Sequence, residues 1–215
     1  MTGLLPRWSP GEPLEPLREL LGRGGILAIP TESSYGLAAD PRSAAGVAAI
    51  YRVKERERGK PLLVVAADLE QLEALGADTA VPGMDLVLAA WPAPLTAILP
   101  LRPGFAPPAA AGGSTLAARV PAHAELRKLL VRLGFALTAT SANLAGEEPI
   151  VEPSRLDELL AGEDAAIWDA GELPGGPPST LVALRKDGFE ILRQGAFAAG
   201  TFPAGSESRK VLPPG

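Results

Sequence analysis

The chain has 215 residues, 47% of them apolar and 21% charged, and a formal net charge of −5, a composition that argues against a disordered protein. The acidic balance also argues against a protein that coats nucleic acid through bulk positive charge. With no cysteine and one histidine, the chain has no disulfide, thiolate metal site or cysteine nucleophile, and a histidine-rich zinc site is nearly excluded.

The first half of the chain predicts helices that alternate with buried strands. Residues 1–12 mix Pro, Gly and Ser, so we expect a loosely ordered lead-in there. Apolar spacing then predicts a helix over 14–21, a strand over 26–29, a helix over 43–52, a strand over 61–66 and short helices over 68–75 and 82–90. Pro30 ends the first strand, because proline cannot donate to a sheet. The unbroken apolar run 61–66 is typical of a central strand buried on both faces.

The second half predicts a similar alternation that closes in a hairpin. We expect strands over 95–99 and 115–120, a helix over 122–133, a strand from 135, a helix over 153–160, a strand over 165–168 and a hairpin over 179–193. The stretch 102–114 is rich in Pro, Gly and Ala, and we predict a lid there, because long loops inside compact domains are usually functional. His123 stands at a helix start, where we expect it to face solvent without a catalytic role.

Two predicted strands end in stretches rich in hydroxyl groups. Residues 31–35 follow the first strand, and residues 138–143 follow the strand from 135. α/β proteins place ligands at such strand ends, although an isolated loop of this kind is more often a simple polar turn. Within the first stretch, Glu32 is either a metal ligand or a solvated carboxylate, and we favour the solvated carboxylate.

Positive charge is concentrated in residues 51–60. The charged side chains of this segment are Arg52, Lys54, Glu55, Arg56, Glu57, Arg58 and Lys60. One interpretation is a solvated helix end, because cations stabilise a helix C-terminus and pair with neighbouring glutamates. The other is a site for a small polyanion such as a triphosphate, which needs several cations on adjacent oxygens. The residues alone leave both interpretations open.

One further cation, Arg119, lies in the otherwise apolar strand 115–120. An ordinary edge-strand arginine is one interpretation of it. Because an unpaired charge in an apolar strand is costly, we instead expect Arg119 to have a carboxylate partner.

Seven short strings stand in a fixed order over residues 24–195. They are Pro30-Thr31-Glu32-Ser33-Ser34-Tyr35-Gly36-Leu37, Lys54-x-Arg56 followed by Pro61-Leu62, Trp91-Pro92-Ala93-Pro94-Leu95-Thr96, Arg119-Val120-Pro121, Ser141-Ala142-Asn143, Ser179-Thr180 and Arg193-x-Gly195. This order resembles that of YrdC-like threonylcarbamoyl-AMP synthases. Each string alone is a weak signal, whereas seven in register cover nearly the whole chain except its two tails.

The resemblance implies a fold and a reaction. The fold would be a single α/β domain in which a twisted, mixed parallel and antiparallel sheet, flanked by helices, forms a concave basic cavity. The enzyme would be a nucleotidyltransferase that converts L-threonine, bicarbonate and ATP, with Mg²⁺, into L-threonylcarbamoyl-adenylate and pyrophosphate. That adenylate is the activated intermediate for N6-threonylcarbamoyladenosine in tRNA.

The resemblance also implies roles for particular residues. The catalytic residues would be Lys54 and Arg56. The ATP site would consist of Lys54, Arg56, Arg58, Thr115, Ser141, Asn143 and Arg193. The threonine site would consist of Thr31, Tyr35, Arg119 and Ser179. No side chain is assigned to a metal, and two positions depart from the family pattern: Ser33 replaces a threonine, and Pro149 replaces a hydroxyl residue that touches ATP.

We therefore expect a lead-in over 1–12, a catalytic domain over 13–199 and a tail over 200–215. No apolar segment approaches the ~20 residues of a membrane span, so we expect a cytoplasmic protein that works with tRNA and the threonylcarbamoyl-transfer machinery. Two rival functions are an RNA-binding module of the same fold and the carbamoyl-transfer domain of hydrogenase maturation. The absence of cysteines disfavours the second rival, whose zinc fingers are missing.

Overall fold

The computed structural model describes residues 4–57, 59–186 and 188–198. Its helices are α1 Glu15–Gly22, α2 Ala44–Val53, α3 Leu69–Ala74, α4 Met84–Ala90, α5 Ala124–Leu133, α6 Ser154–Leu159 and the short 3₁₀ helix η1 Pro108–Ala110. The expected mixed α/β class is confirmed, because these helices flank strands that pair in both directions. The strands divide into two sheets, where one sheet was expected.

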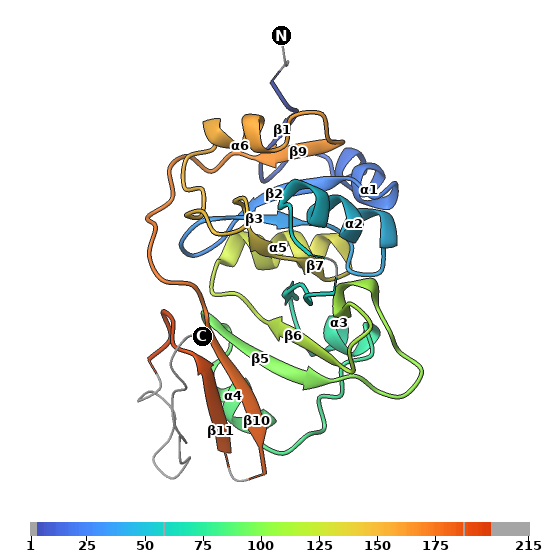
Figure 1. Cartoon of the computed structure of the whole chain (residues 1–215), viewed down its shortest axis with the longest axis vertical. Helices are drawn as coiled ribbons and strands as arrows, with labels where there is room; N and C mark the ends of the chain where they lie inside the picture. The colour runs from blue at the N-terminus through green and yellow to red at the C-terminus, as the bar shows by residue number, and fades with distance from the viewer. Residues whose placement is uncertain (1–3, 58, 187, 199–215) are drawn as a thin grey trace.

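The first sheet has five strands and lies in the upper part of Figure 1. In spatial order these are β1 Arg7–Trp8, β9 Ala165–Trp168, β2 Ile26–Pro30, β3 Tyr35–Ala38 and β8 Thr140–Ser141. The pairs β1·β9 and β9·β2 are parallel, and β2·β3 and β3·β8 are antiparallel. The apolar side chains of β2 are completely buried, as expected from the run 26–29.

The second sheet has six strands and lies in the lower part of Figure 1. In spatial order these are β11 Gly188–Arg193, β10 Thr180–Arg185, β5 Leu95–Pro100, β6 Thr115–Arg119, β4 Val64–Val65 and β7 Leu137–Thr138. The predicted C-terminal hairpin is confirmed as the antiparallel pair β10·β11. The predicted strand over 61–66 shortens to β4, which pairs on both sides and is fully buried.

The two sheets meet where the chain passes from β7 into β8. Only Ala139 separates the last residue of β7 in one sheet from the first residue of β8 in the other. Thr138 strengthens this junction: its backbone N–H donates to Ala39 O at 2.9 Å, and its hydroxyl accepts from the Ala39 N–H at 2.9 Å. The loop that follows β2 and the loop that follows β8 are thereby held near each other, since β3 pairs with β8.

Three local expectations are corrected by the structure. Residues 35–38 form strand β3, so the polar stretch after Pro30 is the tip of a β2–β3 hairpin. The lead-in is not loose at β1, because β1 pairs with β9 and Trp8 is 4% exposed. The stretch 102–114 is not a lid, because η1 within it is buried at Ala109 and Ala110 and accepts from the Leu62 N–H.

The helix ends follow ordinary capping chemistry. Ser43 accepts from the Gly46 N–H and caps the N-terminus of α2, and Lys54 is the C-cap residue that follows its last residue, Val53. His123 is half-buried rather than solvent-facing: Nδ1 accepts from the Leu126 N–H to cap α5, and the ring packs edge-on against Trp168. In the part of the chain that the structure describes, no helix is both long and apolar enough to cross a membrane.

Candidate active site

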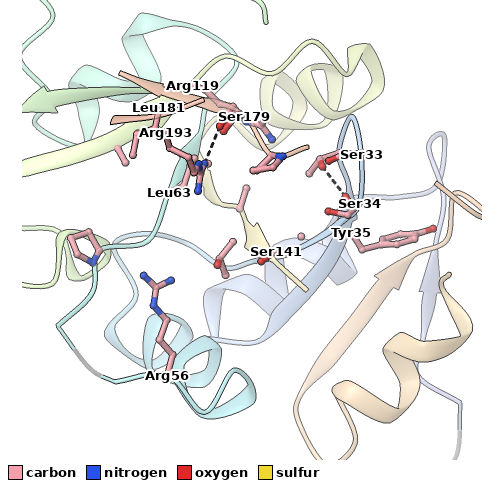
Figure 2. Close-up of a pocket in the computed structure, with 17 residues that line it drawn as sticks. Ser33, Ser34, Tyr35, Arg56, Leu63, Arg119, Ser141, Ser179, Leu181 and Arg193 are labelled. Atoms are coloured by element: carbon pink, nitrogen blue, oxygen red, sulfur yellow. Dashed lines mark hydrogen bonds between the residues drawn. The ribbon is translucent and has the colours of Figure 1, made fainter. Parts of the chain in front are cut away.

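A cavity of about 350 Å³ lies where the two sheets face each other, a size ordinary for a small-molecule site. Figure 2 shows the side chains that enter it from the β2–β3 loop, the end of α2, and strands β6, β8, β10 and β11. Among the described residues, the charged side chains in its lining are Arg56, Arg119 and Arg193, and none of these lining residues is a carboxylate. We call this site the arginine cavity. Its side-chain chemistry suits a polyanion.

Arg119, at the end of β6, is 6% exposed and has the carboxylate partner that its apolar strand predicts. Glu32 Oε2 lies 3.0 Å from Arg119 Nη1, and Glu32 Oε1 accepts from the Ala122 N–H at 2.7 Å. Glu32 is therefore not the solvated carboxylate expected, because its side chain is only 21% exposed and ion-paired. Burial lowers the pKa of Arg119, and Glu32 opposes that shift.

Arg193 and Ser179 form one wall of the cavity (Figure 2). Arg193 Nη2 donates to Ser179 O at 3.0 Å, and the Ser179 and Thr96 hydroxyl oxygens are 2.8 Å apart. Burial lowers the pKa of Arg193. Arg56 stands across the cavity from both, and its half-buried guanidinium forms no hydrogen bond or ion pair with any described residue.

Lys54, two residues before Arg56, is buried, and its side-chain donors are all used within the protein. It is 4% exposed, and Nζ donates to Ser141 O at 2.5 Å, to Asn143 O at 2.9 Å and to Asn143 Oδ1 at 2.7 Å. An ammonium group has three N–H donors, so all of them are used inside the protein. Burial, with a smaller contribution from Arg56, lowers the pKa of Lys54 to about 8.

We call Lys54, Ser141 and Asn143 the lysine cluster. Ser141 Oγ donates to Asn143 Oδ1 at 2.6 Å, and Asn143 Nδ2 donates to Glu147 O at 2.6 Å. Ser141 also lines the arginine cavity, whereas Lys54 and Asn143 do not. The polar-turn interpretation of residues 141–143 therefore describes this structure well. A phosphate contact of Lys54 or Asn143 stays a prediction.

Thr31 and Tyr35 also line the cavity, but their hydroxyl groups are engaged within the protein. Thr31 Oγ1 donates to Ser34 O at 2.7 Å and closes the tip of the β2–β3 hairpin. The Tyr35 hydroxyl donates to Gly171 O at 2.8 Å and accepts from the Ala170 N–H at 3.0 Å. Its ring points away from the three arginines in Figure 2. Tyr35 therefore lines the cavity by its backbone side, and its threonine contact stays a prediction.

Besides Lys54 and Asn143, a third predicted ATP residue, Thr115, does not line the arginine cavity. Thr115 begins β6 and lines a separate cavity of about 330 Å³ with Pro82 and Arg185. Four residues of extended strand place it ~13 Å from Arg119, at the other end of β6. Arg58 lies outside the described residues.

The structure adds lining residues that sequence reasoning missed, among them Ala117 and Leu181. Each stands two positions from a residue that was predicted, Arg119 and Ser179 respectively. Side chains two apart on a strand share a face, so this spacing was a usable signal.

Comparison with known proteins gives a consistent picture. The family model Sua5/YciO/YrdC, whose description is "Telomere recombination", matches residues 19–195. Threonylcarbamoyl-AMP synthase of Idiomarina loihiensis is 39% identical over 174 residues, which is 80% of this chain and 92% of that protein. The synthase of Thiobacillus denitrificans is 34% identical over 168 residues, 78% of this chain and 89% of that one.

Among solved structures, Pyrococcus abyssi Sua5 in complex with L-threonine is similar to 90% of this chain, with 29% identity and a TM-score of 0.77. This chain spans 58% of that Sua5 chain, and 61% of the same protein in a second structure. It is therefore shorter than those solved relatives, whereas it matches nearly the full length of the two bacterial synthases.

Proposed function

The chain belongs to the Sua5/YciO/YrdC family, and we propose that it is an L-threonylcarbamoyladenylate synthase, a nucleotidyltransferase. Its substrates would be ATP, L-threonine and bicarbonate, which loses water to supply CO₂ (HCO₃⁻ + H⁺ gives CO₂ + H₂O), and its products threonylcarbamoyl-AMP, pyrophosphate and water. The observation that carries this proposal is the arginine cavity, to which the described part of the chain contributes three guanidinium groups and no carboxylate. ATP is a polyanion and L-threonine carries a carboxylate, and bidentate arginine contacts are typical of carboxylate and phosphate recognition.

The geometry supports a division of the cavity into two halves. Arg119 and Ser179 would hold threonine, with the guanidinium on the carboxylate and the hydroxyl near the amino-acid side chain. Arg56 stands across the cavity with unused donors, where it would contact the phosphates of ATP. Among the described residues, the Arg193 side chain donates one hydrogen bond, to Ser179 O, and its remaining donors would serve the nucleotide half.

Catalysis would come from positioning and charge neutralisation. The threonine amine takes up CO₂ as a carbamate, and a carbamate oxygen forms a bond to the α-phosphorus of ATP as the bond to pyrophosphate breaks. Negative charge accumulates on the departing pyrophosphate, so a preorganised cation there lowers the barrier. Arg56 is the side chain best placed for this role, because its guanidinium has no internal partner to give up.

Mg²⁺ would enter as the counter-ion of ATP. No cavity-lining residue is a carboxylate, and the described residues contain no group of three or more His, Cys, Asp or Glu side chains that would hold a metal. Mg²⁺ is commonly bound by substrate phosphates and water with few protein ligands. The side chains present thus fit a metal carried by the phosphates, which would supply further charge neutralisation.

We further propose that the product is passed to the tRNA threonylcarbamoyl-transfer machinery in the cytoplasm. The competing function is an RNA-binding module that uses the arginine cavity. Such a module would bind duplex RNA or tRNA with a steep dependence on salt and would not bind ATP.

Pyrophosphate release, measured with each substrate omitted in turn, tests the proposal. We expect release only when ATP, L-threonine and bicarbonate are all present, and threonylcarbamoyl-AMP detected by mass spectrometry in the same samples. Release without threonine, or RNA binding without ATP binding, would contradict the assignment.

A further inference from the structure

The ion pair between Glu32 and Arg119 has no role in the mechanism above. Arg119 lines the arginine cavity and Glu32 does not, so Glu32 contacts the guanidinium from outside the cavity. We propose that Glu32 is a positioning residue, which holds the Arg119 guanidinium in the orientation that receives the substrate carboxylate. This inference rests on the proposed function, because it assumes that Arg119 binds the threonine carboxylate.

The carboxylate of Glu32 is itself fixed in place. Its Oε1 accepts the Ala122 N–H at 2.7 Å, in the turn between β6 and α5, while Oε2 lies 3.0 Å from Arg119 Nη1. Glu32 belongs to the tip of the β2–β3 hairpin, where its neighbours Thr31 and Ser33 line the cavity. A single side chain thus connects the hairpin tip, the turn after β6 and the guanidinium.

The pair leaves Arg119 able to bind a second anion. Arg119 Nε is buried and has no hydrogen-bond partner, and Glu32 Oε2 is likewise buried without a hydrogen bond. Buried polar atoms are normally paired, so the contact of Glu32 with the guanidinium is incomplete and is made at Nη1 rather than Nε. Because Arg119 lines the arginine cavity, an incoming carboxylate would bind the guanidinium donors that Glu32 does not use and that face the cavity.

Charge supports the same assignment. The Arg119 side chain is more than nine-tenths buried. Arg193 lines the same cavity, and repulsion between the two positive charges helps to lower the pKa of Arg119. Glu32 is the carboxylate that acts on Arg119 in the described part of the chain. Without it, two guanidinium groups would share a buried region with no counter-charge, and Arg119 would turn toward water.

The test is Glu32→Gln, which preserves side-chain volume and the acceptor for the Ala122 N–H but removes the negative charge. We expect the KM for threonine to rise about tenfold or more, as loss of a charge-assisted contact does. The Kd for ATP, measured by calorimetry without threonine, should stay nearly unchanged. A role in holding the loop alone predicts no change in either quantity, because glutamine keeps the Ala122 contact.

Glu163→Gln is the matched control. The side chain of Glu163 is 21% exposed, as is that of Glu32, and it pairs with an arginine, Arg52, at 2.7 Å. Neither Glu163 nor Arg52 lines the arginine cavity. We expect this variant to bind threonine and ATP as the wild type does. If Glu32→Gln does not fold, Glu32→Asp is used instead. Aspartate keeps the negative charge but is one methylene shorter, so its carboxylate lies farther from Arg119. The threonine KM should then rise, and the Kd for ATP should stay unchanged.

An unchanged threonine KM in the folded Glu32 variant would overturn the positioning role. A lower KM would also overturn it, because it would mean that Glu32 competes with the substrate carboxylate. A wild type that releases no pyrophosphate refutes the proposed function separately. In that case the calorimetric Kd for L-threonine decides: weaker binding by Glu32→Gln supports the inference, and no binding by the wild type overturns it.

Discussion

The lysine cluster and the arginine cavity share Ser141 but use their cations in opposite ways. In the lysine cluster, the three hydrogen bonds of Lys54 Nζ go to oxygens of Ser141 and Asn143. In the arginine cavity, Arg56 has no partner among the described residues, and Arg119 keeps a buried Nε without a hydrogen bond. Two cations only two positions apart in the sequence, Lys54 and Arg56, therefore have different roles in the structure.

The difference follows from the shapes of the two cations. An ammonium group is compact and has three donors, so a few carbonyl oxygens at a loop can satisfy it completely. A guanidinium group presents five donors in a rigid plane, and the backbone around a cavity rarely satisfies them all. The lysine cluster is therefore complete without a ligand, and the arginine cavity is not. Four predictions test this contrast.

The largest effect is expected on turnover. Arg56→Ala should reduce kcat by roughly a hundredfold or more, because it removes a charge contact to the departing pyrophosphate. Its Tm should be close to that of the wild type, since the Arg56 side chain forms no hydrogen bond or ion pair with any described residue and the substitution keeps the backbone N–H that donates to Tyr51 O. Arg52→Ala is the control, because Arg52 lies in the last turn of α2, four residues before Arg56, but pairs with Glu163 at the surface. Equal turnover by the two variants would remove Arg56 from the mechanism.

The second largest effect is expected on the free energy of unfolding. Lys54→Met should lower the free energy of unfolding by about 2–3 kcal/mol, because the partly buried backbone oxygens of Ser141 and Asn143 lose the donor that Nζ supplies. Urea denaturation measures this change. The control is Lys128→Met, in which an exposed lysine paired with Glu125 is lost, and no comparable change is expected. A Lys54→Met variant as stable as the wild type but inactive would instead assign Lys54 to the phosphates.

A smaller effect should separate the halves of the arginine cavity. Arg119→Lys keeps the charge but loses the planar fork, so the threonine KM should rise about tenfold while the Kd for ATP stays nearly constant. Steady-state kinetics and calorimetry without threonine provide the two values. If ATP affinity falls and the threonine KM does not, Arg119 belongs to the nucleotide half.

The smallest effect concerns pH. The pKa of Lys54 is lowered from 10.5 to about 8 in the folded protein, so between these values the unfolded chain binds more protons. The free energy of unfolding of the wild type should therefore rise, relative to that of Lys54→Met, as pH increases through this window. Urea denaturation of both proteins at the two ends of this pH window measures the two free energies of unfolding. A constant difference would mean that the three oxygens around Nζ keep the ammonium protonated and cancel the effect of burial.

Local patterns predicted most of the elements. Apolar spacing located β2, α2 and the β10·β11 hairpin to within a residue or two, because helix and strand periods are properties of neighbouring residues. β3 was missed, since Tyr35-Gly36-Leu37-Ala38 is too short for a period to be seen. Its strand character comes from pairing with β2 and β8. The buried η1 was missed for the same reason, as its prolines and alanines resemble a loop until Leu62 binds to them.

The sequence by itself determined the α/β class, the order of the elements, the family, and the presence of arginines and hydroxyl groups at the right strand ends. It also required a carboxylate for Arg119, but it did not identify Glu32. Only the tertiary structure decided that Glu32 is that carboxylate, that Lys54 is enclosed while Arg56 is free, and that Thr115 lies at the far end of β6. These outcomes depend on which distant segments meet across two sheets, and the burial and donor count of a side chain are set by those neighbours rather than by its own position in the chain.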